Sequence, residues 1–163
     1  MKTLLIMRHG KSSWKNDKLA DHDRPLAKRG RIDVPKMGLL VRDEDIVPDI
    51  ILCSTARRAR ETTELFIDSS GFDGPVQYHR SIYQGYVSDY IDLFQALGQT
   101  YKIAMAIGHN PGVEELLSTL VDVDEWMPTA CIAQIEVSIE EWQALNEYST
   151  GELVNLWRPR EIS

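Results

Sequence analysis

Positive charge is scarce in this sequence, because 18 Lys and Arg residues are opposed by 25 Asp and Glu residues over 163 positions. The formal net charge is therefore −7 at pH 7. Binding to the phosphate backbone of a nucleic acid requires a surplus of positive charge, so we expect no nucleic-acid partner. An acidic total is still compatible with a local basic pocket. The length is typical of one domain, and we expect residues 1–163 to form one.

Long hydrophobic runs are missing as well. The apolar run at residues 3–7 is too short for the core of a signal peptide and far too short to cross a bilayer. Apolar residues make up 43% of the chain and charged residues 26%, which is close to the globular average and argues against extensive disorder. We therefore expect a soluble, cytoplasmic protein with no membrane partner.

Cysteine is also rare, with only Cys53 and Cys131, far apart and in apolar surroundings. We expect both to be buried free thiols of a cytosolic protein, although the sequence leaves a single disulfide between them open. Closely spaced His, Cys and Asp residues of the kind that bind metal ions are lacking. The sequence therefore predicts no metal site and no cofactor.

Short apolar runs that predict strands alternate with amphipathic segments that predict helices. The predicted strands lie at residues 4–7, 49–53, 102–107, 131–137 and 152–157, and the predicted helices at 32–41, 56–67, 90–97 and 112–121, with a short final helix at 140–145. Pro35 is tolerated only in a first turn, so the regular part of the first helix is expected to begin near it. This alternation is typical of an α/β fold, a three-layer α/β/α sandwich with a mainly parallel sheet.

Polar residues follow three of the predicted strands. The triplet Arg8-His9-Gly10 comes after the first strand, residues 54–62 with three arginines after the second, and residues 108–112 with a histidine after the third. The carboxyl ends of parallel strands share one edge of a sheet, where ligands bind. We therefore expect these three segments to converge.

The convergent side chains suit phosphoryl transfer without a metal. Arginine presents a planar, permanently charged fork that matches phosphate oxygens. A neutral histidine can attack phosphorus to give a phosphohistidine, and a second, protonated histidine can donate to the equatorial oxygens of the transition state. The helices that begin after Ser54 and Asn110 add backbone donors and a favourable dipole.

Each segment taken alone also has a structural explanation. Arg57, Arg58 and Arg60 could form a solvated helix face with Glu61 as a charge partner. Residues 108–111 could be a turn that ends a strand and caps a helix. These explanations account poorly for the occurrence of all three segments at strand ends, so we favour a functional site.

In combination the motifs resemble the histidine phosphatase superfamily, which has the phosphoglycerate mutase-like fold. Residues 8–10 resemble its Arg-His-Gly signature, residues 54–62 its Ser-x-x-x-Arg-Ala-x-x-Thr element, and residues 108–109 its second-histidine motif. The short chain, the segment Asp23-Arg24-Pro25-Leu26 followed by Gly30, and residues 108–111 are similar to the small SixA-type phosphohistidine phosphatases.

The resemblance implies roles for individual residues. His9 would be the nucleophile, and the other catalytic residues would be Arg8, Arg58 and His109, which grip the phosphoryl oxygens. The implied substrate-binding residues are Arg24, Gly10, Ser12 and Asn110. For Arg24, an ion pair that only holds the loop after the first strand is an equally weighted alternative.

One departure from the larger members of the superfamily is informative. Mutases and acid phosphatases carry an acidic residue after a middle segment to protonate the leaving oxygen, and residues 80–89 show no obvious match. Asp89 and Asp92 are expected instead to cap or decorate the following helix. Loss of acid catalysis slows departure of a poor leaving group by about 10²–10⁴-fold. A phosphoramidate suffers less, because its nitrogen can take a proton from solvent before the bond breaks.

The sequence therefore predicts a phosphatase that acts on phosphohistidine in a phosphorylated protein partner, such as a histidine phosphotransfer domain, and releases phosphate ion. Such an activity belongs to signal transduction. Two alternatives stay open: a phosphomonoester phosphatase of the same superfamily, and a non-catalytic regulator that binds phosphoproteins.

Overall fold

A single six-stranded sheet organises the computed structural model, which describes residues 1–162. The strands are β1 (Lys2–Arg8), β2 (Ile50–Ser54), β3 (Val76–His79), β4 (Ile103–Gly108), β5 (Ile132–Val137) and β6 (Gly151–Trp157). Their order across the sheet is β3-β2-β4-β1-β5-β6. Strands β1 to β4 are parallel, whereas β5 is antiparallel to both of its neighbours. The mainly parallel α/β sheet predicted from the sequence is confirmed.

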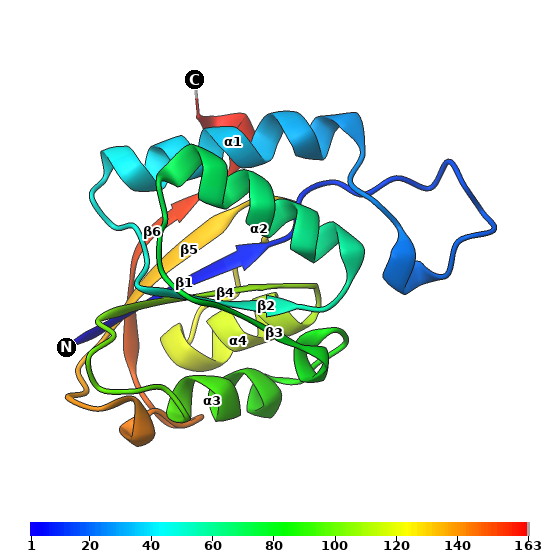
Figure 1. Cartoon of the computed structure of the whole chain (residues 1–163). Helices are drawn as coiled ribbons and strands as arrows, with labels where there is room; N and C mark the ends of the chain where they lie inside the picture. Colours follow the sequence, from blue (N-terminus) through cyan, green and yellow to red (C-terminus); the bar gives the residue numbers. More distant parts are fainter. Residues whose placement is uncertain (163) are drawn as a thin grey trace.

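Two layers of helices cover the sheet. The α-helices are α1 (Lys28–Asp43), α2 (Arg57–Ser70), α3 (Val87–Gln95) and α4 (Gly112–Val121). Helices α1 and α2 lie on one face, and α3 and α4 lie on the other (Figure 1). Four single 3-10 turns complete the structure: η1 (Asp21–Asp23), η2 (Arg80–Ile82), η3 (Trp142–Ala144) and η4 (Pro159–Glu161). The three-layer arrangement follows from strands that are apolar on both sides.

Strand β1 illustrates how the core forms. Leu4 and Ile6 belong to the apolar cluster beneath α3 and α4, whereas Leu5 and Met7 belong to the cluster beneath α1 and α2. Successive side chains of a strand point to opposite faces, so an uninterrupted apolar run supplies both clusters at once. Each of these four side chains is fully buried. Burial of one such side chain contributes roughly 1.5–3 kcal/mol to folding.

The first helix differs from the prediction, because it begins at Lys28 and contains Pro35 in its interior. Proline lacks the amide hydrogen that would bond the carbonyl of Arg31. Arg31 is exposed, so water can hydrate that carbonyl. Gly38 lies on the buried face of the helix, where an added Cβ would come within 1.8 Å of Ser69 Oγ on α2. Gly38 therefore allows α1 and α2 to pack closely together.

Two shorter elements also depart from expectation. Strand β3 was missed, because it is a short edge strand whose residues are only partly buried or exposed and so show no apolar pattern. The final helix predicted at 140–145 is instead the single turn η3, where Trp142 is buried and donates from Nε1 to the carbonyl of Tyr101 at 2.8 Å. Within residues 1–162, no helix combines the length and apolarity that a bilayer crossing requires.

Candidate active site

Three neighbouring strands end at the same edge of the sheet and bring the predicted site residues together. Arg8 pairs with Gly108 in the β1–β4 register, and the amide of His9 donates to the carbonyl of Gly108 at 3.0 Å. A pocket of about 230 Å³ lies there. It is lined by Arg8, His9, Lys11, Ser12, Trp14, Arg24, Arg58, His109, Asn110 and Thr129. Every predicted site residue except Gly10 therefore borders one pocket.

His9 is buried, with 6% of its surface exposed, and its ring has a defined tautomer. Its Nδ1 lies 2.7 Å from the carbonyl oxygen of Gly10. Because a carbonyl oxygen can only accept, Nδ1 carries the proton and donates it. The other ring nitrogen, Nε2, therefore keeps its lone pair, which is the requirement for a nucleophile.

Gly10 serves the site as backbone rather than as a wall of the pocket. Its amide donates to Thr62 Oγ1 at 3.0 Å, and Thr62 Oγ1 donates in turn to the carbonyl of Arg58 at 2.7 Å. A Cβ at Gly10 would lie 2.9 Å from Val34 and 3.2 Å from Gly30. The turn that follows β1 is therefore packed directly against α1 and tied to α2, which fixes the His9 ring.

His109 stands beside His9, with ring centroids 4.9 Å apart. Its Nε2 lies 2.7 Å from Ser54 Oγ at the end of β2, and Tyr83 contacts its ring edge-on at 5.6 Å. These contacts set the orientation of the ring from two other segments of the chain. The sequence motifs contain Ser54 but gave no reason to assign it this role.

Both imidazoles are neutral at pH 7. Burial, followed by the proximity of His109, lowers the pKa of His9 well below its ordinary value, and the charges of Arg58 and Arg8 act in the same direction. Burial and then the charge of Arg58 lower the pKa of His109 to about 3. A neutral His9 suits nucleophilic attack. The expectation of a protonated second histidine is not met in the protein alone, because burial and then the nearby charge of Arg58 disfavour its protonation.

Three buried nitrogen atoms of the pocket have no hydrogen-bond partner among residues 1–162. They are Arg8 Nε, Arg58 Nε and His109 Nδ1. Buried polar groups are almost always hydrogen-bonded, and the two arginine N–H groups can only donate, so they are suited to a ligand rich in acceptor oxygens. Arg8 is meanwhile held by a bond from Nη1 to the carbonyl of Met127 at 3.1 Å. The residues that surround the two histidines therefore fit a bound oxyanion.

Asp21, in the turn η1, organises the arginines and was not anticipated from the sequence. Its carbonyl accepts from Arg58 Nη1 at 2.7 Å, and its carboxylate accepts from Arg58 Nη2 and Arg24 Nε, each at 3.1 Å. The Tyr83 hydroxyl donates to it at 2.6 Å. Burial tends to raise the pKa of Asp21, but the hydrogen bond from Tyr83 and the charge of Arg58 outweigh this effect and lower the pKa to about 2. Asp21 is therefore a carboxylate at neutral pH.

Arg24 forms the ion pair that the sequence left open and also borders the pocket. It is buried, with 6% of its surface exposed, and borders the pocket. Its Nη1 donates to Ser12 Oγ at 2.8 Å, and its guanidinium stacks on Trp14 at 3.4 Å from the ring centroid. Together with the ion pair to Asp21, these bonds make Arg24 both a support of the loop after β1 and a wall of the pocket.

Two further predictions concern the neighbours of the central residues. Asn110 donates from Nδ2 to Glu114 Oε1 at 2.9 Å and to the carbonyl of Met127 at 3.1 Å, so its side chain is fixed at the start of α4. On α2, Arg57 forms an ion pair with Glu61 at 3.3 Å. The helix-face explanation thus applies to Arg57, whereas its neighbour Arg58 turns into the pocket.

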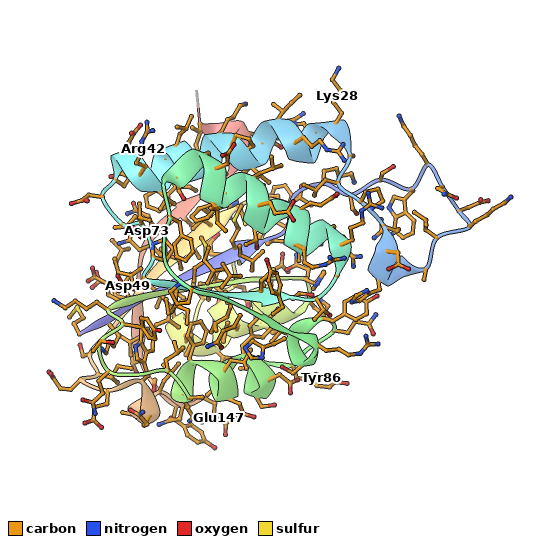
Figure 2. All side chains as sticks on the ribbon, viewed as in Figure 1. Lys28, Arg42, Asp49, Asp73, Tyr86 and Glu147 are labelled. Atoms are coloured by element: carbon orange, nitrogen blue, oxygen red, sulfur yellow. The ribbon has the colours of Figure 1, made fainter. Side chains whose placement is uncertain are left out.

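The middle segment at residues 80–89 supplies no acid to the pocket. Asp89 Oδ2 accepts from the amide of Tyr86 at 2.8 Å and caps α3, as the sequence indicated. Figure 2 shows Tyr86 at the start of α3, near the end of the sheet that carries the pocket. Among the described residues that line the catalytic pocket there is no Asp or Glu.

The fold and the pocket define a class of protein: a three-layer α/β protein with paired histidines and arginines, suited to a phosphoryl group, at the carboxyl edge of its sheet. Residues 4–87 match the family model of the histidine phosphatase superfamily, branch 1. The chain belongs to this superfamily.

Known proteins share the sequence and the fold of this chain over nearly its whole length. An uncharacterised protein of Mycobacterium leprae is 32% identical over 167 residues, which covers 94% of this chain and 100% of that protein. Among solved structures, a candidate phosphohistidine phosphatase SixA from Agrobacterium tumefaciens has a TM-score of 0.84 at 24% identity, over 97% of this chain and 98% of that one. The protein histidine phosphatase SixA complexed with tungstate has a TM-score of 0.85 at 21% identity, over 99% of each chain.

Proposed function

We propose that this protein removes phosphoryl groups from phosphohistidine residues of other proteins through a covalent phospho-His9 intermediate. The observation that carries the proposal is the neutral His9 ring, which donates from Nδ1 to Gly10 and keeps the Nε2 lone pair. The unpartnered donors of Arg8 and Arg58 support a phosphoryl ligand. The similar SixA structure with tungstate, a phosphate mimic, also supports it.

The reaction proceeds in two displacements. In the first, His9 Nε2 attacks phosphorus, the new P–N bond forms, and the P–N bond of the substrate breaks as its imidazole leaves with a proton taken from solvent. In the second, water attacks phospho-His9, transfers a proton to solvent, and releases phosphate and neutral His9. Arg8, Arg58 and His109 stabilise the equatorial oxygens in both transition states. Burial and the charge of Arg58 keep His109 neutral in the protein alone. The negative charge of a bound phosphoryl group acts in the opposite direction and favours protonation of His109.

A phosphohistidine substrate suits this pocket better than a phosphate ester does. An alkoxide leaving group needs a proton donor, and none of the described residues that line the pocket has a carboxyl group. Asp21, which bonds Arg58, has a pKa of about 2 and holds no proton at neutral pH. A phosphoramidate nitrogen accepts its proton from water. The substrate that follows from this reasoning is a protein with a phosphorylated histidine, such as a phosphotransfer domain of a signalling system.

The test compares phosphate release from a phosphohistidine-bearing protein, p-nitrophenyl phosphate and 3-phosphoglycerate. We expect release chiefly from phosphohistidine, with loss of activity in His9→Ala. His79→Ala is the matched control, because the ring of His79 bonds Gln77 on the edge strand β3. Faster release from either ester would assign the protein as a phosphomonoester phosphatase. No release, combined with tight binding of the phosphoprotein, would assign it as a regulator.

A further inference from the structure

A second and larger cavity adjoins the catalytic pocket. Its volume is about 570 Å³, against about 230 Å³ for the pocket that contains His9. We call it the basic groove, because five of its lining residues are cationic: Arg8, Lys11, Arg29, Arg158 and Arg160. Only two carboxylates, those of Asp33 and Glu161, line it. A concentration of positive charge in a chain with a net charge of −7 calls for a functional explanation.

Local ion pairs neutralise only part of this charge. Asp33 accepts two bonds from Arg29 Nε, at 3.1 and 3.0 Å. Arg158 pairs with Glu125 at 3.0 Å and more distantly with Glu161 at 3.7 Å. In the part of the chain that the structure describes, Lys11 and Arg160 form no ion pair, and both are exposed. The basic groove therefore presents uncompensated positive charge to solvent.

The basic groove is continuous with the catalytic pocket. Arg8, Lys11 and Thr129 line both cavities. The basic groove is therefore within reach of a large substrate whose phosphoryl group is bound at His9. Trp126, with 61% of its surface exposed, adds an aromatic surface to the groove.

We infer that the basic groove binds an acidic segment of the protein substrate, adjacent in space to the phosphohistidine that enters the pocket. This inference rests on the proposed function and names the feature by which the substrate is selected. The free charges lie on separate elements, Lys11 in the loop after β1 and Arg160 in η4, rather than around one point. Together with a volume more than twice that of the phosphoryl pocket, this spread fits several carboxylates along a polypeptide.

Charge complementarity of this kind acts on association. Long-range attraction between a positive groove and an acidic partner raises the association rate and disfavours basic partners. Salt weakens the attraction, because the groove charges are exposed and the Debye length falls as ionic strength rises. Arg160 does not line the catalytic pocket, so turnover of a substrate without an acidic segment should not depend on this residue.

The experiment uses two peptides that carry the same phosphohistidine, one flanked by Asp and Glu and the other by Asn and Gln, together with free phosphohistidine. For the wild type we expect kcat/KM to favour the acidic peptide by about tenfold at low ionic strength. We expect the preference to fall below about twofold in about 0.5 M salt. Arg160→Glu should abolish it and leave turnover of free phosphohistidine unchanged.

Arg42→Glu is the matched control, since it makes the same charge change in the last turn of α1, and Arg42 does not line the groove. Figure 2 shows Arg42 and Lys28 at opposite ends of this helix. It should keep the preference for the acidic peptide. Equal kcat/KM for both peptides in the wild type, or an unchanged preference in Arg160→Glu, would overturn the inference.

A binding measurement separates this inference from the proposed function. Fluorescence anisotropy of a labelled, unphosphorylated acidic peptide reports on the groove without any hydrolysis. Weaker binding to Arg160→Glu than to Arg42→Glu supports the groove even where no phosphohistidine is hydrolysed, in which case only the proposed function fails. Equal binding of the peptide to both variants would overturn the inference that the groove binds an acidic segment. Displacement of the peptide by inorganic pyrophosphate at lower concentrations than by the unlabelled peptide would assign the groove to a small anion and overturn it too.

Discussion

The catalytic pocket and the basic groove share Arg8 and Lys11, yet they hold their charges in opposite ways. In the pocket, Arg24 and Arg58 are each only 6% exposed and are fixed by bonds to Asp21. In the groove, Arg160 is exposed and unpaired within residues 1–162. Fixed, desolvated charge stabilises one transition state, whereas exposed charge attracts partners of varied shape. Substitutions in the two regions should therefore differ both in magnitude and in salt dependence.

The largest effect is expected at the nucleophile. His9→Ala should lower kcat by at least about 10⁴-fold at any ionic strength, because no covalent intermediate can form. Incubation with a radiolabelled phosphohistidine protein, followed by an alkaline quench, should trap label on the wild type and none on the variant. Label retained by His9→Ala would place the nucleophile elsewhere.

The next largest loss of kcat is expected at Arg58, and its neighbour Arg57 provides the comparison. Arg58→Ala should lower kcat by about 10²–10³-fold, the usual loss for one preorganised donor. Arg57→Ala should change it by less than about twofold, because the ion pair of Arg57 with Glu61 is exposed and such pairs contribute little. Steady-state kinetics of both variants on the same substrate measures the two values of kcat. Similar losses of kcat in both variants would contradict the placement of Arg58 in the pocket and of Arg57 outside it.

Asp21 should act as a positioning residue. Asp21→Asn weakens the hold on Arg58 and should lower kcat by about tenfold, as typical for loss of an outer partner. It also removes a negative charge near the bound phosphoryl group, so KM should stay constant or fall. A rise in KM at constant kcat would show that Asp21 contributes to substrate binding rather than to the orientation of Arg58.

The smallest expected effect is on the pH dependence of the free energy of unfolding. The pKa of His109 is about 3 in the folded protein, below its ordinary value near 6.5, so the unfolded chain binds a proton that the folded chain does not. Stability should therefore fall as pH decreases from about 6.5 towards 3, by at most about 1.4 kcal/mol per pH unit for each such histidine. His109→Gln should flatten the dependence measured by urea unfolding between pH 5 and 7, as about one proton fewer is bound on unfolding. An unchanged slope would contradict the neutral state of His109.

The sequence predicted the site residues at the strand ends better than the residues that hold them in position. Arg8, His9 and His109 follow apolar runs that can form only buried strands, so their convergence follows from parallel topology. Asp21 lies in a polar segment without periodicity, and its contact with Arg58 depends on the path of the loop, which no local pattern encodes. Tyr83 was unassigned for the same reason. The edge strand β3 was missed because its residues are only partly buried or exposed, so its sequence shows no apolar pattern.

The loop between β1 and α1 projects from the body of the protein (Figure 1), and its two ends are fastened to each other. Ser13 N donates to the carbonyl of Pro25 at 2.8 Å, and Ala27 N donates to that of Lys11 at 2.8 Å. The exposed tip at residues 15–18 lies beyond this hydrogen-bonded neck and contributes no residue to the lining of the pocket. An insertion at the tip lengthens a loop that is already closed, which costs little in entropy. The tip is accordingly a natural attachment point for a reporter or an additional recognition module that leaves the chemistry of the pocket intact.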